Sequence, residues 1–551
     1  DVLSPVTPGP SSSNTCGPYR IARLARALLG EPPRHITVRM ARRGGYYDTF
    51  YSMHSHEAIL AALLGQELLR CDLSTMCRQA DEAGLCYGFQ FVDDLPVRPS
   101  ELAEMELSGD RRTIRLTGVS LGGGEIEITR LNGSDILLRG KRRETVCLGP
   151  EGARVVSEDT AAGPGQWLAR LEPLFPFPQQ EGTIPFRTAQ EMFAFARDTG
   201  RPLWRVAFDY ESALTGATEA ELRAYARQVL DICRHARQQG VRPDNHFIGV
   251  TDARAARYKA LREGGKLIDL GAADEACLDA MSIMEFSNAH GTIVCMPTGG
   301  ASGIVPAAVY RIGERLGKTE TEQENALLVA GLIGAFYYPT HYTGAIGCQA
   351  EIGVAVSMAS AALCSMMTDD PDTIHCAASL GGQVLMGLLC NPIEGYVQVP
   401  CIVRNMAAVP TAVTCANAAL AGMDHIVPLD DVVALMLPHS PQTEGLMDAR
   451  RLRLMKEDAI LLSMGRGSVL DQEALAAVMG EGRLWGAALD VTVPEPLPQD
   501  SPLWDIPDLL ITPHVAGGMR LEITRRTCVE MAQDNLKRYL AGEPLENLVE
   551  G

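Results

Sequence analysis

The 551-residue sequence lacks the features of a membrane protein or a nucleic-acid-binding protein. Its longest apolar runs, such as IGVAVSMASAAL at 352–363, fall short of the roughly 20 residues that a membrane-spanning helix needs. It has no surplus of basic residues, because 68 Asp and Glu outnumber 49 Lys and Arg and give a formal net charge of -19. Nucleic acids and anionic membranes bind basic faces, so neither is expected as a partner.

No disulfide framework is present, although the chain has 15 cysteines. They are too dilute for a disulfide-stabilised fold and follow no regular spacing. The first residues show no basic segment followed by an apolar stretch, so no signal peptide is predicted. We expect a soluble cytoplasmic protein with reduced thiols, some of which are available to bind a metal.

The length and the changes in residue pattern predict a multidomain protein. Residues 1–150 alternate helix-like and strand-like patterns, which predicts an α/β domain. Residues 151–184 are rich in Gly, Pro, Glu and Gln and predict a linker. Residues 185–428 have a helical period and predict an all-helical domain. Residues 429–551 alternate short apolar runs with helices, which predicts a partial Rossmann-like α/β segment.

Three cysteines stand in unusual settings. Cys390 and Cys401 each lie beside a proline in LLCNPIEGYVQVPCIVRN, and Cys348 lies in the glycine-rich TGAIGCQAEIG just before a predicted helix. Proline ends a helix and leaves its neighbour in an irregular segment, where an iron-sulfur cluster can be approached. The start of a helix places unpaired amides near a sulfur. Any one of these cysteines taken alone is more often a small buried hydrophobe than a ligand.

Three segments in the predicted helical domain resemble the α part of the iron-sulfur L-serine ammonia-lyases. They are MPTGGASGIVPA at 296–307, GCQAEIGVAVSMA at 347–359 and LLCNPIEGYVQVPCIVRNMAAV at 388–409. The β part of that family is resembled by GPSSSNTCGP at 9–18, HSHEAILAALLG at 54–65 and VSLGGGEIEI at 119–128. The resemblance implies a 4Fe-4S cluster held by Cys348, Cys390 and Cys401, with the remaining iron open to the substrate.

Elimination of water from serine needs groups that hold the carboxylate and a group that accepts the α-proton. Glycine-rich and hydroxyl-rich loops suit the first task, and the candidate substrate-binding residues are Ser11, Ser12, Ser13, Thr298, Gly299 and Gly300. A Pro-Gly turn and a polar terminal loop are the plain alternatives for these segments. His54 is the candidate catalytic base, with His56 as a competitor and a solvated loop histidine as the plain alternative.

Two departures from the family pattern leave the substrate open. Asn14 stands where the family usually has histidine after the serine triplet, and Arg98 stands where it often has a His-Pro segment. Asparagine forms hydrogen bonds but carries no proton at neutral pH. A small amino acid is expected as substrate, either L-serine or another β-substituted amino acid such as cysteine losing sulfide.

From Asp431 onward the sequence resembles the D-isomer-specific 2-hydroxyacid dehydrogenases. The resemblance implies dehydrogenase-like roles for Arg466 in GRGSVLD, Glu495 in PEP and His514 in TPH. No G-x-G-x-x-G followed by an acidic residue precedes this segment, so NAD binding is not expected. Half a nucleotide-binding sheet would expose an edge, so this segment is expected to pack on the helical domain, to pair with another chain, as in a homodimer, or to be poorly folded. A catalytically inactive fusion protein is the remaining alternative.

Overall fold

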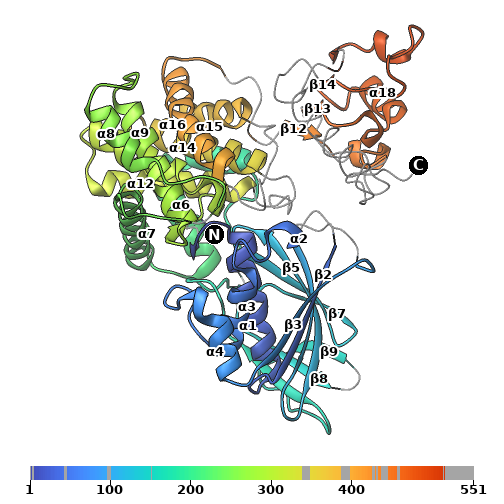
Figure 1. Cartoon of the computed structure of the whole chain (residues 1–551). Coiled ribbons are helices and arrows are strands. Elements are labelled where there is room, and N and C mark those ends of the chain that lie inside the picture. The colour runs from blue at the N-terminus through green and yellow to red at the C-terminus, as the bar shows by residue number, and fades with distance from the viewer. Residues whose placement is uncertain are drawn as a thin grey trace, which may run out of the picture. The chain divides into compact units, whose positions relative to one another are not determined.

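The computed structural model divides after Asp430 into two units, which are described separately (Figure 1). The described residues are Val2, 5–42, 46–95, 101–149, 152–180, 182–247, 249–337, 348–385, 398–424 and, with further gaps, 429–514. The first unit holds an α/β part and a helical part, and the second holds a small parallel sheet. No helix among the described residues is long and apolar enough to cross a membrane.

The α/β part of the first unit is built on a six-stranded sheet with the order β3-β2-β4-β5-β6-β7. Strands β2 and β3 pair in parallel and the others are antiparallel. The strands are β2 (His35–Ala41), β3 (Cys86–Val92), β4 (Glu101–Ser108), β5 (Thr113–Gly122), β6 (Glu125–Leu131) and β7 (Ser134–Leu138). Buried and exposed residues alternate along the first half of β5, as expected of a strand with one face on a core.

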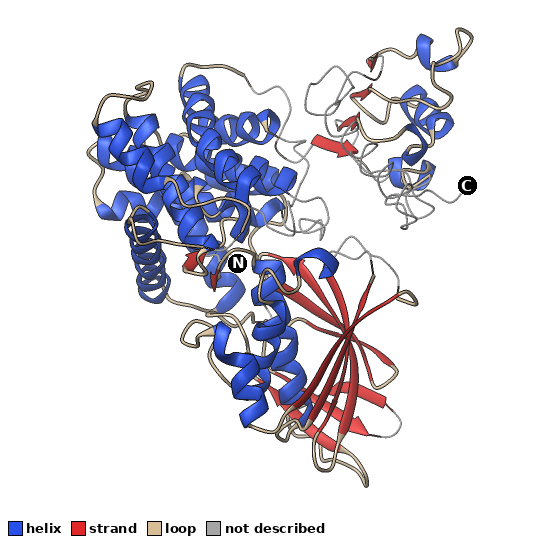
Figure 2. Ribbon diagram, in the orientation of Figure 1, coloured by secondary structure: helices blue, strands red, loops and turns tan. Residues whose placement is uncertain are grey.

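Helices of the α/β part lie on one face of this sheet (Figure 2). They are α1 (Gly17–Leu29), α2 (Tyr46–Thr49), α3 (Ser55–Leu64) and α4 (Met76–Glu82). Ile21, Leu24 and Leu28 of α1 are fully buried and share one core with the strands. The α/β character expected for residues 1–150 is what the structure has.

The expected linker at 151–184 is wrong over two stretches, which form strands. Strands β8 (Glu144–Gly149), β9 (Gly152–Val156) and β10 (Trp167–Leu171) make an antiparallel sheet with the order β10-β8-β9. Trp167 donates its indole N–H to the Leu28 carbonyl at 2.9 Å, which ties β10 to α1. The Gly- and Pro-rich composition therefore marks the turn between β9 and β10, and the flanking residues continue the core of the α/β part.

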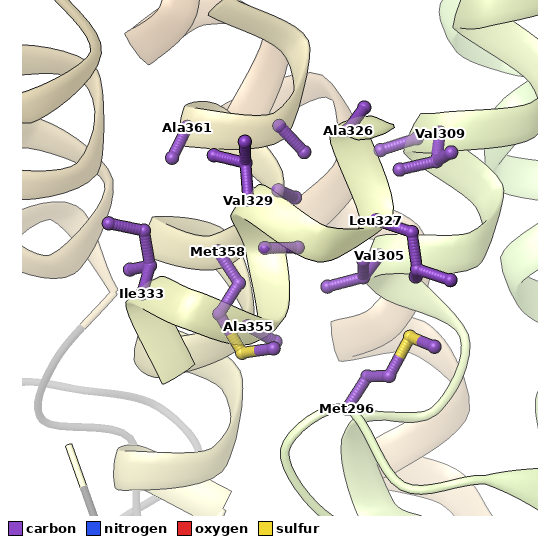
Figure 3. Packing of buried hydrophobic residues seen from close by; sticks show 14 of the residues in the cluster. Met296, Val305, Val309, Ala326, Leu327, Val329, Ile333, Ala355, Met358 and Ala361 are labelled. Carbon is purple, nitrogen blue, oxygen red and sulfur yellow. The ribbon is translucent and has the colours of Figure 1, made fainter. Parts of the chain in front are cut away.

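The helical part of the first unit is packed around one large apolar core. Its helices are α5 (Ala189–Thr199), α6 (Leu203–Thr215), α7 (Glu219–Gly240), α8 (Ala255–Glu263), α9 (Ala272–Asn288), α10 (Ile304–Ala307), α11 (Gly313–Arg315), α12 (Glu320–Tyr337), α14 (Cys348–Ser365), α15 (Pro371–Val384) and α16 (Gln398–Leu420). In Figure 3 the side chains of Val305, Leu327 and Met358 lie among small alanines on neighbouring helices. Small residues allow the close helix packing that this core requires.

Two short strands join the beginning of the chain to the helical part, so that part is not wholly helical. Strand β1 (Val6–Pro8) pairs antiparallel with β11 (Thr292–Val294). Val2 is 1% exposed and belongs to the core of the helical part. This pairing places the serine-rich turn that follows β1 beside the glycine-rich loop that follows β11.

The second unit contains a parallel sheet with the order β12-β13-β14-β15. Its strands are β12 (Val432–Leu435), β13 (Ile460–Ser463), β14 (Gly486–Leu489) and β15 (Leu509–Ile511), with the helices α17 (Ala449–Leu452) and α18 (Gln472–Gly480). Leu461, Leu475 and Leu489 are buried in a core of their own. Short parallel strands alternating with helices agree with the Rossmann-like character expected for this segment.

Candidate functional site

The glycine-rich loop after β11 lies directly against the serine-rich turn after β1. The Gly299 amide donates to Ser12 Oγ at 3.4 Å. A Cβ atom at Gly299 would lie 3.0 Å from the Pro10 carbonyl oxygen and 3.1 Å from the Ser12 nitrogen. Such close approach of two backbones favours glycine at this position. Candidate substrate-binding residues from both parts of the first unit are therefore adjacent.

Hydrogen bonds within the serine-rich turn fix its shape. Ser11 caps a short π-helix (Ser12–Cys16), and its hydroxyl accepts from the backbone and side-chain amides of Asn14 at 3.3 and 3.2 Å. Ser11 and Ser13 hydroxyls lie 3.5 Å apart. Thr49 donates to Asn14 Oδ1 at 2.7 Å. Asn14 therefore organises the turn with hydrogen bonds that need no titratable group.

Gly300 is the point at which two cysteine-bearing helices meet the loop. The Asn405 side-chain amide donates to the Gly300 carbonyl at 2.8 Å and to the Cys401 carbonyl, one turn earlier in α16, also at 2.8 Å. A Cβ atom at Gly300 would lie 2.6 Å from Glu351 Oε2 in the first turn of α14, the helix that begins at Cys348. The first turn of α14 and the Cys401 turn of α16 thus converge on one glycine.

Two of the three predicted cluster ligands, Cys348 and Cys401, are among the residues that the structure describes. Cys401 is 1% exposed and lies in the core of the helical part, and Cys348 is the first residue of α14. Cys390 and Arg98 lie outside the described residues. Thiolates are the protein ligands of iron-sulfur clusters, and two of the three cysteines stand on helix turns that share Gly300. Three thiols are the right type of donor for such a cluster, and its binding stays a prediction.

A partly buried acid, Glu351, and a buried hydroxyl, Thr298, lie beside this convergence. Burial raises the pKa of the Glu351 carboxyl to about 7, and the Thr298 hydroxyl partly offsets the rise. Thr298 is 1% exposed, and its hydroxyl lies close enough to the Glu351 carboxyl to act on its pKa. Glu351 and Asn405 were not predicted as site residues, although each follows a candidate cysteine by about one helical turn.

His54, the candidate base, lies directly before helix α3 in the α/β part of the first unit. It precedes the helix in a left-handed conformation, with φ of 57°. Its Nδ1 is hydrogen-bonded to the Glu57 carboxylate, and its ring centroid lies 4.1 Å from that of His290. His290 was not predicted, because nothing in the local sequence links it to His54. A carboxylate bonded at Nδ1 leaves Nε2 of a neutral imidazole able to accept a proton.

His56, the competing histidine, lies in different surroundings. Its ring contacts Tyr51, with centroids 4.9 Å apart, and burial lowers its pKa. His56, Glu57 and Cys77 bring one potential metal-ligand atom each within 4.8 Å of one another. Since one oxygen of Glu57 already binds His54, we assign no metal to this group.

In the second unit the dehydrogenase-like residues are partly assembled. His514 Nδ1 lies 2.8 Å from Glu495 Oε1, and the two side chains are 39% and 41% exposed. The Arg466 guanidinium donates to the Gly465 carbonyl at 2.9 Å. The acid-histidine pair is present, but it is exposed and lies outside the strands of the small sheet.

Comparison with known proteins identifies two regions. Residues 191–442 match the family model described as serine dehydratase alpha chain, and residues 398–516 match the D-isomer specific 2-hydroxyacid dehydrogenase, NAD binding domain. The L-serine dehydratase of Streptomyces coelicolor is 29% identical over 457 residues, which cover 78% of this chain and 91% of that protein. The L-serine dehydratase alpha chain of Peptoniphilus asaccharolyticus is 32% identical over 252 residues, covering 45% of this chain and 86% of that one. The chain belongs to the serine dehydratase family.

Solved structures of D-isomer specific 2-hydroxyacid dehydrogenases are also similar to part of this chain. A D-isomer specific 2-hydroxyacid dehydrogenase from Xanthobacter autotrophicus Py2, solved with NADPH and MES, is 40% identical. The alignment covers 22% of this chain and 48% of that one, with a TM-score of 0.19. This chain therefore spans about half the length of that dehydrogenase.

Proposed function

We propose that this protein is an L-serine ammonia-lyase that converts L-serine to pyruvate and ammonia, with a 4Fe-4S cluster held by Cys348, Cys390 and Cys401. The observation that carries the proposal is the convergence of the Cys348 and Cys401 helix turns on Gly300, beside the serine-rich turn. Family membership and the L-serine dehydratase relatives support the same activity.

The loop and the turn would hold the substrate carboxylate. Ser11, Ser12 and Ser13 supply hydroxyls from one side, and Thr298, Gly299 and Gly300 supply a hydroxyl and amides from the other. Amides and hydroxyls held in place before binding stabilise the charge that develops on a carboxylate during proton abstraction. When bound, the cluster would supply a Lewis acid for the departing hydroxyl group.

His54 would accept the α-proton. Its Nδ1–H donates to Glu57, so the neutral ring keeps a lone pair at Nε2. The Cα–H bond breaks and the proton moves to Nε2, while the electron pair forms the Cα–Cβ double bond and the β-oxygen leaves as hydroxide. The resulting enamine tautomerises to an imine, which water hydrolyses to pyruvate and ammonia.

A direct assay tests the proposed activity. Protein reconstituted anaerobically with iron and sulfide is given L-serine, D-serine or L-cysteine, and pyruvate, ammonia and sulfide are measured. Pyruvate and ammonia from L-serine support the proposal. Sulfide release from L-cysteine, with no product from L-serine, would show that the substrate is another β-substituted amino acid and not serine. No product from any of the three would refute the lyase activity.

A second candidate function is an NAD-dependent D-2-hydroxyacid dehydrogenase. The His514–Glu495 contact and the match at 398–516 favour it. The missing glycine-rich fingerprint opposes it, because the pyrophosphate of NAD needs that turn. Oxidation of NADH with a panel of 2-oxo acids tests this candidate directly. If neither activity is found, the inactive fusion protein is the remaining candidate.

A further inference from the structure

A second histidine faces His54 from the helical part. His290 follows the end of α9 and precedes β11. Its φ is 60°, in the left-handed region that glycine and asparagine normally occupy when they end a helix. The backbone here closes α9, because the Gly291 amide donates to the Phe286 carbonyl at 2.9 Å. A histidine in this conformation is uncommon, because its Cβ atom crowds the backbone there.

One nitrogen of His290 is tethered to the segment that leads into the serine-rich turn. Nδ1 lies 3.2 Å from the Gly9 carbonyl oxygen. A carbonyl oxygen only accepts, so Nδ1 is the nitrogen that carries the hydrogen. Gly9 is itself held in place, because its amide donates to the Gly291 carbonyl at 3.0 Å. The neutral ring of His290 is thus fixed in one tautomer, with a lone pair at Nε2.

The two imidazoles contact each other edge to face. Their centroids are 4.1 Å apart and their planes meet at 73°. His54 is bonded on another edge to Glu57, whose side chain is only 10% exposed. His54 is therefore confined between an acid of its own helix and a histidine from the helical part. Two left-handed histidines from distant segments build this contact together.

The charge of His290 is limited by its surroundings. Burial, followed by the neighbouring His54, lowers the pKa of His290 to about 4. The Gly9 carbonyl and Glu57 oppose that shift, and no other described titratable group acts on the ring. Two charged imidazoles at this distance would repel each other. His290 is therefore uncharged near neutral pH, and it adds no positive charge beside the His54 ring.

We propose that His290 is a positioning residue of the lyase: a neutral imidazole, tethered to Gly9, that fixes the ring of His54 against Glu57 and stays uncharged while His54 carries the substrate proton. This inference rests on the proposed function for its catalytic meaning. The coupling between the two rings, however, is a property of the protein without cluster or substrate, and it can be measured separately.

The coupling is tested by NMR on the full chain before reconstitution, with the histidine rings labelled with 13C. The variants are His54→Asn and His290→Asn, because asparagine tolerates the left-handed backbone at both positions. In the wild type the His290 ring should stay neutral from pH 8 to about 5. In His54→Asn its pKa should rise, because the neighbouring charge is removed. The exposed His246→Asn is the matched control and should leave His290 unchanged.

The positioning role is tested by kinetics on the reconstituted protein. His290→Asn should lower kcat by about 10- to 100-fold, since misplacing a base has effects of that order, and should change KM by less than about threefold. It should also alter the pH profile of kcat/KM, which His246→Asn should not. The inference would be overturned if His290→Asn left kcat and the pH profile unchanged. It would also be overturned if the His290 ring had an ordinary histidine pKa that did not change in His54→Asn. If the protein does not turn over serine, the NMR titration still decides whether the rings are coupled.

Discussion

Asn405 donates its side-chain amide to the carbonyl oxygen of Gly300 at 2.8 Å. The same amide nitrogen also donates to the Cys401 carbonyl, and Asn405 Oδ1 accepts from the Gly303 amide at 3.1 Å. One fully buried side chain thus holds the glycine-rich loop at Gly300 and at Gly303 and fixes it to the helix turn of a candidate iron ligand. The candidate substrate loop and the candidate cluster are therefore parts of one hydrogen-bonded structure.

Replacing this side chain should loosen the loop and the cysteine turn together. Asn405→Ala should lower the free energy of unfolding by about 1–3 kcal/mol, because it leaves buried backbone groups without partners. It should also lower the iron retained after reconstitution. Asn417→Ala, at an exposed position of the same helix, is the control for both measurements. Equal iron content and stability in the two variants would show that Asn405 does not hold the site.

A methyl group at Gly300 should disturb the same structure from the other side. The added Cβ would lie 2.6 Å from Glu351 Oε2, so the Glu351 carboxyl must move away from the loop. Gly300→Ala should cost about 1–3 kcal/mol of stability and abolish most of the pyruvate formation. Gly88→Ala provides the comparison, since no atom lies within 4 Å of the corresponding Cβ. A fully active Gly300→Ala protein would contradict the close packing.

Glu351 should make the stability of the cluster-free protein depend on pH. Its pKa is raised by burial from 4.5 to about 7, so the folded state binds a proton that the unfolded state has lost. This contribution is complete below pH 4.5 and is lost as the pH rises toward and past 7. It amounts to up to about 3 kcal/mol. The temperature of thermal unfolding should fall between pH 5 and pH 8, and it should fall less for Glu351→Gln than for the wild type.

The exposed Glu263→Gln variant is the control for that comparison and should follow the wild type at both pH values. If Glu351→Gln and Glu263→Gln lose the same stability between pH 5 and pH 8, then the Glu351 carboxyl does not titrate in this range.

The dehydrogenase-like residues should be dispensable for the lyase reaction. The double variant Arg466→Ala and His514→Ala should form pyruvate from L-serine at the wild-type rate. Titration of the wild-type protein with NADH, followed by fluorescence, should show no saturable binding, because the fingerprint for the pyrophosphate is missing. Saturable binding that this double variant weakens would instead favour a working nucleotide site.

The sequence predicted those helices and strands that the local periodicity of apolar residues determines. The helical period of 185–428 and the short apolar runs after residue 429 each report a local periodicity, and the structure has helices and parallel strands there. The pairing of β1 with β11 escaped prediction, because each strand has three residues and its partner lies far away in the chain. Strands β9 and β10 escaped for another reason, since the turn between them is rich in Gly and Pro.

In the candidate site, too, the residues in recognisable motifs were predicted, and the residues placed by tertiary contacts were not. The serine-rich turn and the glycine-rich loop were predicted from their resemblance to the motifs of the serine ammonia-lyases, and the two segments are adjacent in the structure. Asn405, Glu351 and His290 were missed because their roles come from tertiary contacts that no spacing records. A polar residue one helical turn after a candidate ligand was the available signal for Asn405 and Glu351. His290 had no such signal, because its partner His54 lies in a distant segment.

Iron binding by Cys401 tests the central claim most directly. Wild type, Cys401→Ser and Cys415→Ser are reconstituted anaerobically with iron and sulfide, and bound iron is measured beside pyruvate formation from L-serine. Cys415 is the matched control, because it is also a buried cysteine of α16. We predict about four irons per chain and pyruvate for the wild type and Cys415→Ser, and the loss of both in Cys401→Ser. Equal iron and activity in Cys401→Ser, or no cluster in the wild type, would contradict the account.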